Sequence, residues 1–330
     1  MNTNEQTSPA APANTSRLNN MPIAFFAVVM GLVGLTLTWK QAEQAVIMPF
    51  KASPFLAAIT ATVFVLLLGF YAAKYVLHRK AVLTELHHPV LISYFPTISI
   101  NILSLSVIAY EYNAVLSRGL WLGGAVLHLL LTFYVLSEWM NQSHFDIKHM
   151  NPAWFIPVVG NIVAPIGGMQ HGYVDSSWFF FSVGLMFWLV LMVIVFYRII
   201  FHNPMPDKLL PTLFILIAPP AVGFISYVKI TGSVDAFATI LYHTALFVTL
   251  MLGSQFVKFA RLKFFLSWWA YSFPLAAMTI ATFVMADATG KHWFHVLALV
   301  LFVILNLLLV LLMVRTIESI RHGKICLPAD

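Results

Sequence analysis

The chain alternates between long apolar stretches and short polar connections from Met21 to Thr316. Each stretch holds about 20 residues with few charges, the length that a helix needs to cross a hydrocarbon core about 30 Å thick. Ten such stretches are predicted, at residues 21–40, 54–77, 90–111, 119–141, 152–171, 175–201, 209–230, 234–257, 264–287 and 292–316. The pattern therefore predicts ten membrane spans.

The pattern inside each stretch indicates helices. Runs of Leu, Val, Phe and Ile lack the period-two alternation of a lipid-spanning barrel, and a helix satisfies its own backbone groups in lipid. Composition agrees, because 60% of the residues are hydrophobic and 9% are charged, whereas a soluble domain is roughly half apolar and a quarter charged. We expect an all-α integral membrane protein.

Basic residues divide unequally between the two sides of the membrane. Thirteen of the eighteen Lys and Arg residues lie in the tails and the even-to-odd loops, and the other five are Lys40, Lys51, Arg118, Lys229 and Lys291. The richer side is expected to be cytoplasmic. This predicts a multi-pass protein of the plasma (inner) membrane with both termini in the cytoplasm. The charges are scattered over short loops, so no nucleic-acid partner is expected.

The ends of the chain are polar. Residues 1–20 are rich in Asn, Thr, Pro and Ala and are predicted to be a disordered cytoplasmic tail. Residues 21–316 form the predicted ten-helix transmembrane channel domain, and residues 317–330 a cytoplasmic C-terminal tail. The single cysteine, Cys326, excludes an intramolecular disulfide.

The spans repeat in pairs. The odd-numbered spans begin near Pro22, Pro89, Pro152, Pro211 and Ser267, at spacings of 67, 63, 59 and 56 residues, which predicts five helical hairpins in series. Every proline deep in a span lies in an odd-numbered helix; these are Pro96, Pro157, Pro165, Pro219, Pro220 and Pro274.

Proline in a helix removes a backbone donor, so Pro274 should free the carbonyl of Ala270 and bend the ninth helix. Lipid cannot satisfy a freed carbonyl, whereas a neighbouring helix or a cavity can. We therefore expect the odd helices inside around a pore, the even helices outside, and the freed carbonyls turned toward neighbouring helices. The alternative is that the prolines only kink packed helices.

No charged residue lies near the middle of a span, which favours a passive pathway over a pump or coupled transporter. The best-placed polar residues are neutral: Asn101, Asn161, His128, His243, Gln255 and Asn306. His128 and His243 could ligate haem, but histidines hydrogen-bonded between helices are the simpler interpretation. No metal-ligand cluster accompanies His87 and His88, and no enzyme motif is found. We expect neither cofactor nor metal, and no enzymatic activity.

Five ordered segments carry a family resemblance: HPVLISYFP at 88–96, FIPVVGN at 155–161, IAPPAVGFISY at 217–227, WAYSFPLAAM at 269–278 and the closing helix through His322-Gly323-Lys324. Together they resemble the tellurite-resistance/dicarboxylate transporter family, which contains bacterial TehA and the slow anion channels of plant guard cells. The resemblance implies a homotrimer in which each protomer has quasi-fivefold symmetry around its own pore.

The resemblance also implies site residues. Phe273, in the ninth helix, would plug the pore, and Pro96, Pro157, Pro219 and Pro274 would kink the inner helices. The predicted pore-lining residues are small or polar residues of the inner helices: Gly31, Asn101, Asn161 and Ala277.

The leading functional hypothesis is a channel that passes small monovalent anions, nitrate and chloride, down their gradient. Its partners would be the lipid bilayer and inorganic or small organic anions. The main alternative is a proton-coupled carrier for a C4-dicarboxylate such as malate, or for tellurite. A third is a scaffold or haem-binding subunit that transports nothing.

Overall fold

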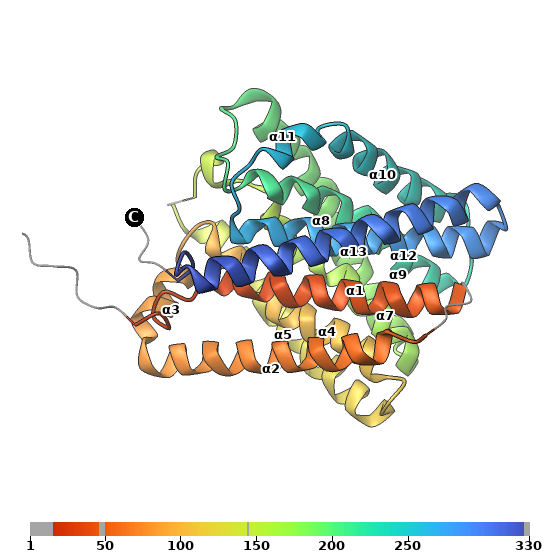
Figure 1. Cartoon of the computed structure of the whole chain (residues 1–330), viewed down its shortest axis with the longest axis horizontal. Helices are drawn as coiled ribbons and strands as arrows, with labels where there is room; N and C mark the ends of the chain where they lie inside the picture. The colour runs from red at the N-terminus through yellow and green to blue at the C-terminus, as the bar shows by residue number, and fades with distance from the viewer. Residues whose placement is uncertain (1–15, 46–49, 144, 327–330) are drawn as a thin grey trace, which may run out of the picture.

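The computed structural model describes residues 16–45, 50–143 and 145–326 (Figure 1). These residues form helices and connections without a β-strand. The prediction of ten spans is confirmed within the described residues; the spans are Ile23–Ala45, Ser53–Leu77, Leu91–Ala109, Ala114–Asn141, Pro152–His171, Val174–Phe201, Leu210–Thr231, Ala236–Gly253, Leu266–Thr289 and His292–Arg321. The chain is therefore an all-α, multi-pass membrane protein.

The two helices of each pair differ in regularity. Every even-numbered span is one α-helix: α2 (Ser53–Leu77), α5 (Ala114–Asn141), α8 (Val174–Phe201), α10 (Ala236–Gly253) and α13 (His292–Arg321). Three short helices, α3 (Arg79–Leu86), η3 (Ile147–His149) and α11 (Phe256–Ala260), lie in the connections.

Every odd-numbered span combines 3₁₀ (η) and α segments. They are η1 (Ile23–Phe25) with α1 (Phe26–Ala45); η2 (Leu91–Tyr94) with α4 (Thr97–Ala109); η4 (Pro152–Trp154), α6 (Phe155–Val159), η5 (Gly160–Val163), α7 (Ala164–Gly168) and η6 (Met169–His171); η7 (Leu210–Ile217) with α9 (Ala218–Thr231); and η8 (Leu266–Tyr271) with α12 (Ser272–Thr289).

The prolines explain most of these breaks. Pro96 immediately precedes α4, and Pro219 and Pro274 lie in the first turns of α9 and α12. A missing N–H does least harm in a first turn, where backbone donors have no partner within the helix. The α segment can therefore start at a proline but cannot extend back through it.

The freed carbonyls correct one expectation. The Ile92 carbonyl, four residues before Pro96, accepts the N–H of Phe95, and the Ile215 carbonyl, four residues before Pro219, accepts that of Ala218. A bond over three residues thus replaces the lost α-helical bond over four, which is the 3₁₀ pattern. These two carbonyls are satisfied within their own span, not by turning to a neighbour.

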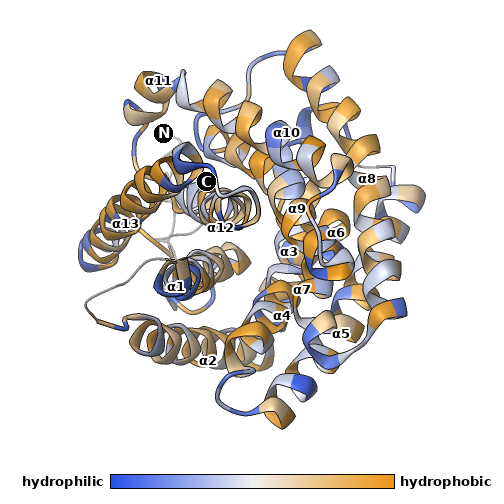
Figure 2. Cartoon of the chain, turned by 90° about the vertical axis from the view of Figure 1, so that its right-hand side faces the viewer, coloured by the Kyte–Doolittle hydropathy of each residue, from blue (hydrophilic) through white to orange (hydrophobic). Residues whose placement is uncertain are grey.

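The inner and outer positions follow the predicted division. In each odd span an apolar window of 18 residues is 67% to 83% buried inside the protein, against 22% to 33% for the corresponding window of each even span. The inner segments pack in a closed ring, α1 on α4, α4 on α7, α7 on α9, α9 on α12 and α12 on α1. Figure 2 shows this ring along the long axis, with α2, α5, α8, α10 and α13 outside it.

Each outer helix packs against the inner segment of its own pair and against the next inner segment. Thus α2 contacts α1 and α4, α10 contacts α9 and α12, and α13 contacts α12 and α1. The same relation recurs for α5, which contacts α4 and α6, and for α8, which contacts α6 and α9. This recurrence agrees with five hairpins arranged with quasi-fivefold symmetry.

Both chain ends meet at one end of the molecule. The Ser16 hydroxyl lies 2.9 Å from His78 Nε2, in the connection between α2 and α3. Arg17 lies beside Gly323, since a Cβ on that glycine would be 3.6 Å from Arg17 Nη2. The N-terminal segment, an even-to-odd loop and the C-terminal segment are thus neighbours, as an even number of spans requires.

The predicted tails differ from the structure in extent. Residues 1–15 and 327–330 of the two tails lie outside the described residues. Residues 16–20 of the N-terminal tail form a turn. Helix α13 continues to Arg321, beyond the predicted end of the last span at Thr316.

Glycine allows α1 to approach α12 closely. A Cβ on Gly31 would lie 2.5 Å from Ser272 Oγ and 2.8 Å from Trp269 Cε3. Gly31→Ala is therefore expected to destabilise the protein by about 1–3 kcal/mol, the usual cost of overpacking. The measurement is the apparent melting temperature in detergent. Gly69→Ala, on lipid-facing α2 with no atom within 4 Å of the added Cβ, is the matched control, and equal melting temperatures for the two variants would contradict the prediction.

Candidate functional site

A cavity lies inside the ring of inner spans. It has a volume of about 80 Å³, room for a few water molecules. All five inner spans contribute to its wall; the lining residues are Ala27, Met30, Tyr94, Thr97, Ile100, Phe155, Ile156, Val159, Gly160, Ile162, Val163, Ile215, Ala218, Pro219, Val222, Trp269, Ala270, Phe273 and Pro274. The cavity thus lies where the sequence predicts a pore.

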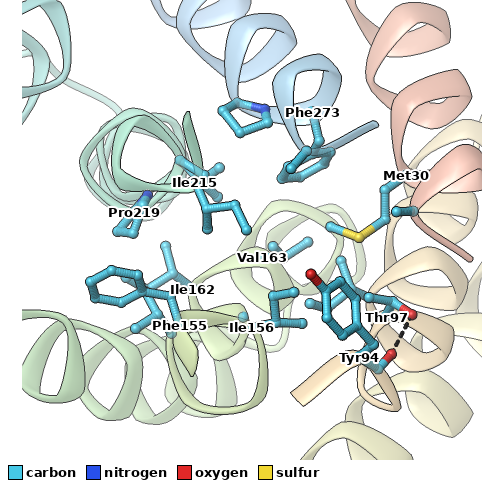
Figure 3. A pocket seen from close by; sticks show the side chains of 18 of the residues that line it. Met30, Tyr94, Thr97, Phe155, Ile156, Ile162, Val163, Ile215, Pro219 and Phe273 are labelled. Atoms are coloured by element: carbon cyan, nitrogen blue, oxygen red, sulfur yellow. Dashed lines mark hydrogen bonds between the residues drawn. The ribbon is translucent and has the colours of Figure 1, made fainter. Parts of the chain in front are cut away.

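The predicted gate, Phe273, lines this cavity from the first turn of α12. In Figure 3 its ring projects into the cavity, with Met30 on one side and Ile215 on the other. The Ser272 hydroxyl, bound to the Trp269 carbonyl at 2.6 Å, and the ring of Pro274 flank it along the chain. The backbone that carries the ring is therefore held from both sides.

The cavity wall is almost entirely apolar. Its lining contains no charged residue, and its hydroxyl groups belong to Tyr94 and Thr97. Thr97 donates its proton to the Tyr94 carbonyl at 2.5 Å, so that proton is engaged. The Tyr94 hydroxyl points toward the interior of the cavity (Figure 3). Tyr94 therefore presents a hydrogen-bond donor to whatever occupies the cavity.

The four predicted kink prolines all lie where α and 3₁₀ segments meet or alternate, but they divide in position. Pro219 and Pro274 line the cavity. Pro96 and Pro157 are buried and are not among its lining residues. They shape the third and fifth spans from behind the wall.

None of the four predicted pore-lining residues belongs to the lining of this cavity. Gly31 faces Trp269 and Ser272 across the contact between α1 and α12, and Ala277 is buried one turn beyond the lining part of α12. Small residues serve close helix packing here, which competes with pore lining as a reason for small side chains.

The amide nitrogens of the two asparagines donate to backbone carbonyls. Asn101 Nδ2 donates to the Phe26 carbonyl at 3.0 Å, joining α4 to α1. Asn161 Nδ2 donates to the Val158 carbonyl at 2.8 Å and to Thr132 Oγ1 at 3.1 Å. Both side chains are fully buried. They satisfy the interrupted backbone of the inner spans instead of facing the cavity.

Two carbonyls of the fifth span receive donors from a neighbouring helix. The Thr132 hydroxyl donates to the Pro157 carbonyl at 2.7 Å, and Trp121 Nε1 donates to the Ala164 carbonyl at 2.8 Å. Both donors lie on α5. The negative ends of these carbonyls are therefore directed at α5 and do not oppose an anion in the cavity.

His128 lies directly behind the wall. Its Nδ1 is 2.9 Å from Ser99 Oγ, and Ser99 Oγ is 2.9 Å from the Pro96 carbonyl. A Cβ on the wall residue Gly160 would lie 3.0 Å from His128 Nε2. His243 differs, because it is exposed on α10 and bonds the Thr239 carbonyl of its own helix at 2.8 Å. The interpretation of a histidine hydrogen-bonded between helices therefore fits His128, which joins α5 to α4, but not His243.

Sequence reasoning missed most of the wall, including Met30, Tyr94 and Phe155. The available signal was the position of Tyr94, two residues before the deep proline Pro96, because residues around these prolines border the break in each inner span. Polar character alone favoured the asparagines, which the structure places away from the cavity.

Comparison with known proteins agrees with this architecture. Residues 20–317 match the family described as voltage-dependent anion channel, SLAC1. The S-type anion channel SLAH3 of Arabidopsis thaliana is 30% identical over 304 residues, which cover 90% of this chain and 48% of that protein. The chain thus spans about half the length of that plant relative.

Two prokaryotic relatives match over nearly their whole length. An uncharacterized transporter of Methanocaldococcus jannaschii is 27% identical over 94% of this chain and 98% of its own. The tellurite resistance protein TehA homolog of Haemophilus influenzae is 26% identical over 92% of each chain. The TehA homolog is thus a relative of this chain. Because the family match covers nearly all ten spans, this chain belongs to the SLAC1 family of anion channels and transporters.

Proposed function

We propose that the chain is an anion channel in which small monovalent anions pass through the cavity inside the ring, with Phe273 as the gate. The observation that carries this proposal is the Phe273 ring within an apolar cavity walled by all five inner spans. A phenyl ring in a narrow apolar passage obstructs ions both sterically and by excluding water.

The chemistry of the wall favours anions over cations. Cation pathways commonly use carboxylate rings or exposed carbonyls, whereas this wall holds neither a charged side chain nor an amide side chain. The donor that it offers is the Tyr94 hydroxyl, and donors stabilise anions. Weakly hydrated nitrate should pass more readily than chloride, because an apolar wall compensates poorly for lost hydration.

We also propose that the basic end of the molecule is cytoplasmic, following the distribution of Lys and Arg. At the opposite end, Lys40 pairs with Glu111 at 3.0 Å, so its charge is largely compensated. Of the other four basic residues on that side, Lys229 and Lys291 are the ones that we propose bias the rim toward anions. We further propose that the protein is a homotrimer, as the family resemblance implies; the mass of the purified protein in detergent tests this.

The test is reconstitution of the purified chain into liposomes under chloride and nitrate gradients. A channel produces an anion-selective current that does not saturate and does not require a proton gradient. The current carried by nitrate should exceed the current carried by chloride. Saturable uptake of malate or tellurite that requires a proton gradient, without anion current from the wild type or an open-gate variant, would replace the channel by a carrier.

Tyr94→Phe is expected to make the passage less favourable for chloride relative to nitrate. It removes one hydrogen-bond donor to a charged group, and such a bond has a net value of about 1.5–3 kcal/mol. The permeability ratio changes only by the part of this energy that differs between chloride and nitrate. We expect the chloride-to-nitrate permeability ratio, measured from reversal potentials, to fall about three- to tenfold. Tyr242→Phe, a buried tyrosine bound to Thr282 at 3.2 Å outside the cavity, should leave the ratio unchanged. A ratio unaltered by Tyr94→Phe would remove this hydroxyl from the pathway.

A further inference from the structure

A second pocket lies at the basic end of the molecule, between the chain that follows α11 and the last turns of α13. Its volume is about 690 Å³. Figure 1 shows the chain leaving α11 toward the start of the ninth span, beside the C-terminal part of α13. Lys263, Arg315, His322 and Lys324 line it, together with Glu318 and Ser319.

The pocket carries an excess of positive charge. Three permanent cations face one carboxylate, a balance of +2 with His322 neutral. Arg315 Nη1 lies 3.4 Å from Glu318 Oε2, and both side chains are about half exposed. Lys263 and Lys324 are exposed, and within the described residues neither forms an ion pair. Two ammonium groups are therefore open to an anionic ligand.

The end of α13 does not cancel this charge. Carbonyls at a helix C-terminus repel anions when they are free. Here the carbonyl of Glu318 accepts the N–H of His322, and that of Ser319 accepts the N–H of Lys324 at 2.9 Å. Gly323, with φ of 63°, makes this closing turn possible. The carbonyls are thus engaged, and the side-chain cations dominate.

We expect the pocket to lie at the depth of lipid headgroups. Helix α13 has 30 residues, so it is about 45 Å long and extends beyond a hydrocarbon core of about 30 Å. Trp268 forms part of the wall, and its Nε1 donates to the Lys263 carbonyl at 3.1 Å. Tryptophan is enriched at the membrane interface. Leu262 and Phe264 add apolar wall beside the cations.

We infer that this pocket binds a phosphate group, with an anionic phospholipid headgroup as the source that its depth and apolar wall favour. Lys263 and Lys324 contribute the uncompensated charge, Arg315 adds a planar set of donors, and Ser319 offers a hydroxyl. The same chemistry would also accept a soluble phosphate, and the experiment separates the two sources.

The pocket is adjacent to the proposed gate along the chain. Trp268 lines the pocket, and the next residue, Trp269, lines the central cavity. Trp269 Nε1 also donates to Thr316 Oγ1 at 2.9 Å, which ties the start of the ninth span to α13. A headgroup that orders the contact between the start of the ninth span and α13 would therefore restrict the backbone that carries Phe273. That consequence rests on the proposed function, whereas the binding does not.

The test counts bound lipid without measuring current, so its outcome is independent of anion conduction. Native mass spectrometry of the purified full chain, with phosphatidylglycerol or phosphatidylcholine added, gives the affinity for each lipid. Lys263→Gln/Lys324→Gln should weaken phosphatidylglycerol binding about 30-fold, since each basic residue near a membrane surface contributes about fivefold. Both lysines are exposed, so the variant should fold. Lys80→Gln/Lys208→Gln, which removes two lysines outside the pocket, is the matched control and should leave the affinity unchanged.

The source is resolved by a second titration, with inorganic phosphate in detergent. Phosphatidylglycerol binding that depends on the two pocket lysines supports a lipid site. Phosphate binding that depends on them, without a lipid preference, supports the site with a soluble ligand. Equal affinity for the two lipids together with no phosphate binding, or phosphatidylglycerol binding that the pocket variant does not weaken, would overturn the inference.

Discussion

Phe273→Ala is expected to open the protein to anions, with currents under a nitrate gradient rising about 10- to 100-fold over the wild type. The range corresponds to a barrier of about 1.5–3 kcal/mol, the value of one large apolar side chain withdrawn from water. The ring projects into a cavity of about 80 Å³, so its removal enlarges the passage and lets water enter. Planar-bilayer recording measures the effect.

The variant keeps the features that hold the ninth span. Pro274 and the bond between Ser272 and the Trp269 carbonyl do not involve the phenyl ring, so the break between η8 and α12 should persist. Phe273→Leu, which retains part of the volume, should conduct less than the alanine variant. Phe247→Ala, on α10 with 67% of the residue exposed, should conduct no more than the wild type. A Phe273→Ala protein that retains wild-type thermal stability but conducts no more than the wild type would contradict the gate hypothesis.

The spans and their division into inner and outer helices could be predicted because both depend on simple physical rules. Apolar length sets the number of spans. Proline placement then separates the two classes, since an interrupted helix needs polar partners that lipid cannot supply. Pro96, Pro219 and Pro274 all lie in spans that are at least two-thirds buried, as this reasoning requires.

The orientation of single side chains could not be predicted, because the inner spans are not regular helices. A 3₁₀ segment advances about 120° per residue and an α-helix about 100°. Over the six residues of η8 the difference accumulates to about 120°, a third of a turn. Which face of α12 meets the cavity therefore depends on where the 3₁₀ segment ends, and the sequence pattern does not specify that residue.

The two asparagines lie away from the cavity for a second physical reason. An interrupted backbone creates demands of its own, and buried amides are well suited to meet them. Asn101 and Asn161 bond the carbonyls of Phe26 and Val158, so they serve the scaffold. Phe273 was found through the family motif, and its gating role stays a prediction. Tyr94 also lies in a family motif, two residues before Pro96, but the resemblance assigned it no role, although its hydroxyl faces the cavity.

The remaining large effect concerns a buried ion pair where the first inner span begins. Lys74 Nζ lies 2.7 Å from Glu85 Oε1 and donates to the Met21 carbonyl at 2.7 Å. Glu85 Oε2 accepts from the Tyr71 hydroxyl at 2.7 Å and from the N–H of Ile23 at 3.3 Å. The carboxylate thus satisfies a backbone donor at the start of the first span that has no partner within the helix.

Lys74→Met is expected to lower the free energy of unfolding by about 3–5 kcal/mol, because it leaves a nearly buried carboxylate without its cation. Lys74 is 1% exposed and Glu85 12%, so solvent screens the pair little. The measurement is the apparent melting temperature in detergent. Lys148→Met, which breaks an exposed pair with Asp146 at 3.4 Å, is the control and should cost at most about 1 kcal/mol.

The double variant Lys74→Met/Glu85→Leu separates the pair itself from the penalty of an orphaned charge. If desolvation of the carboxylate dominates, the double variant should regain most of the stability that Lys74→Met loses, because no buried charge remains. If the double variant is no more stable than Lys74→Met, the contacts of Glu85 with Tyr71 and Ile23 matter more than the pair. A Lys74→Met protein as stable as the Lys148→Met control would show that the pair does not anchor the first span.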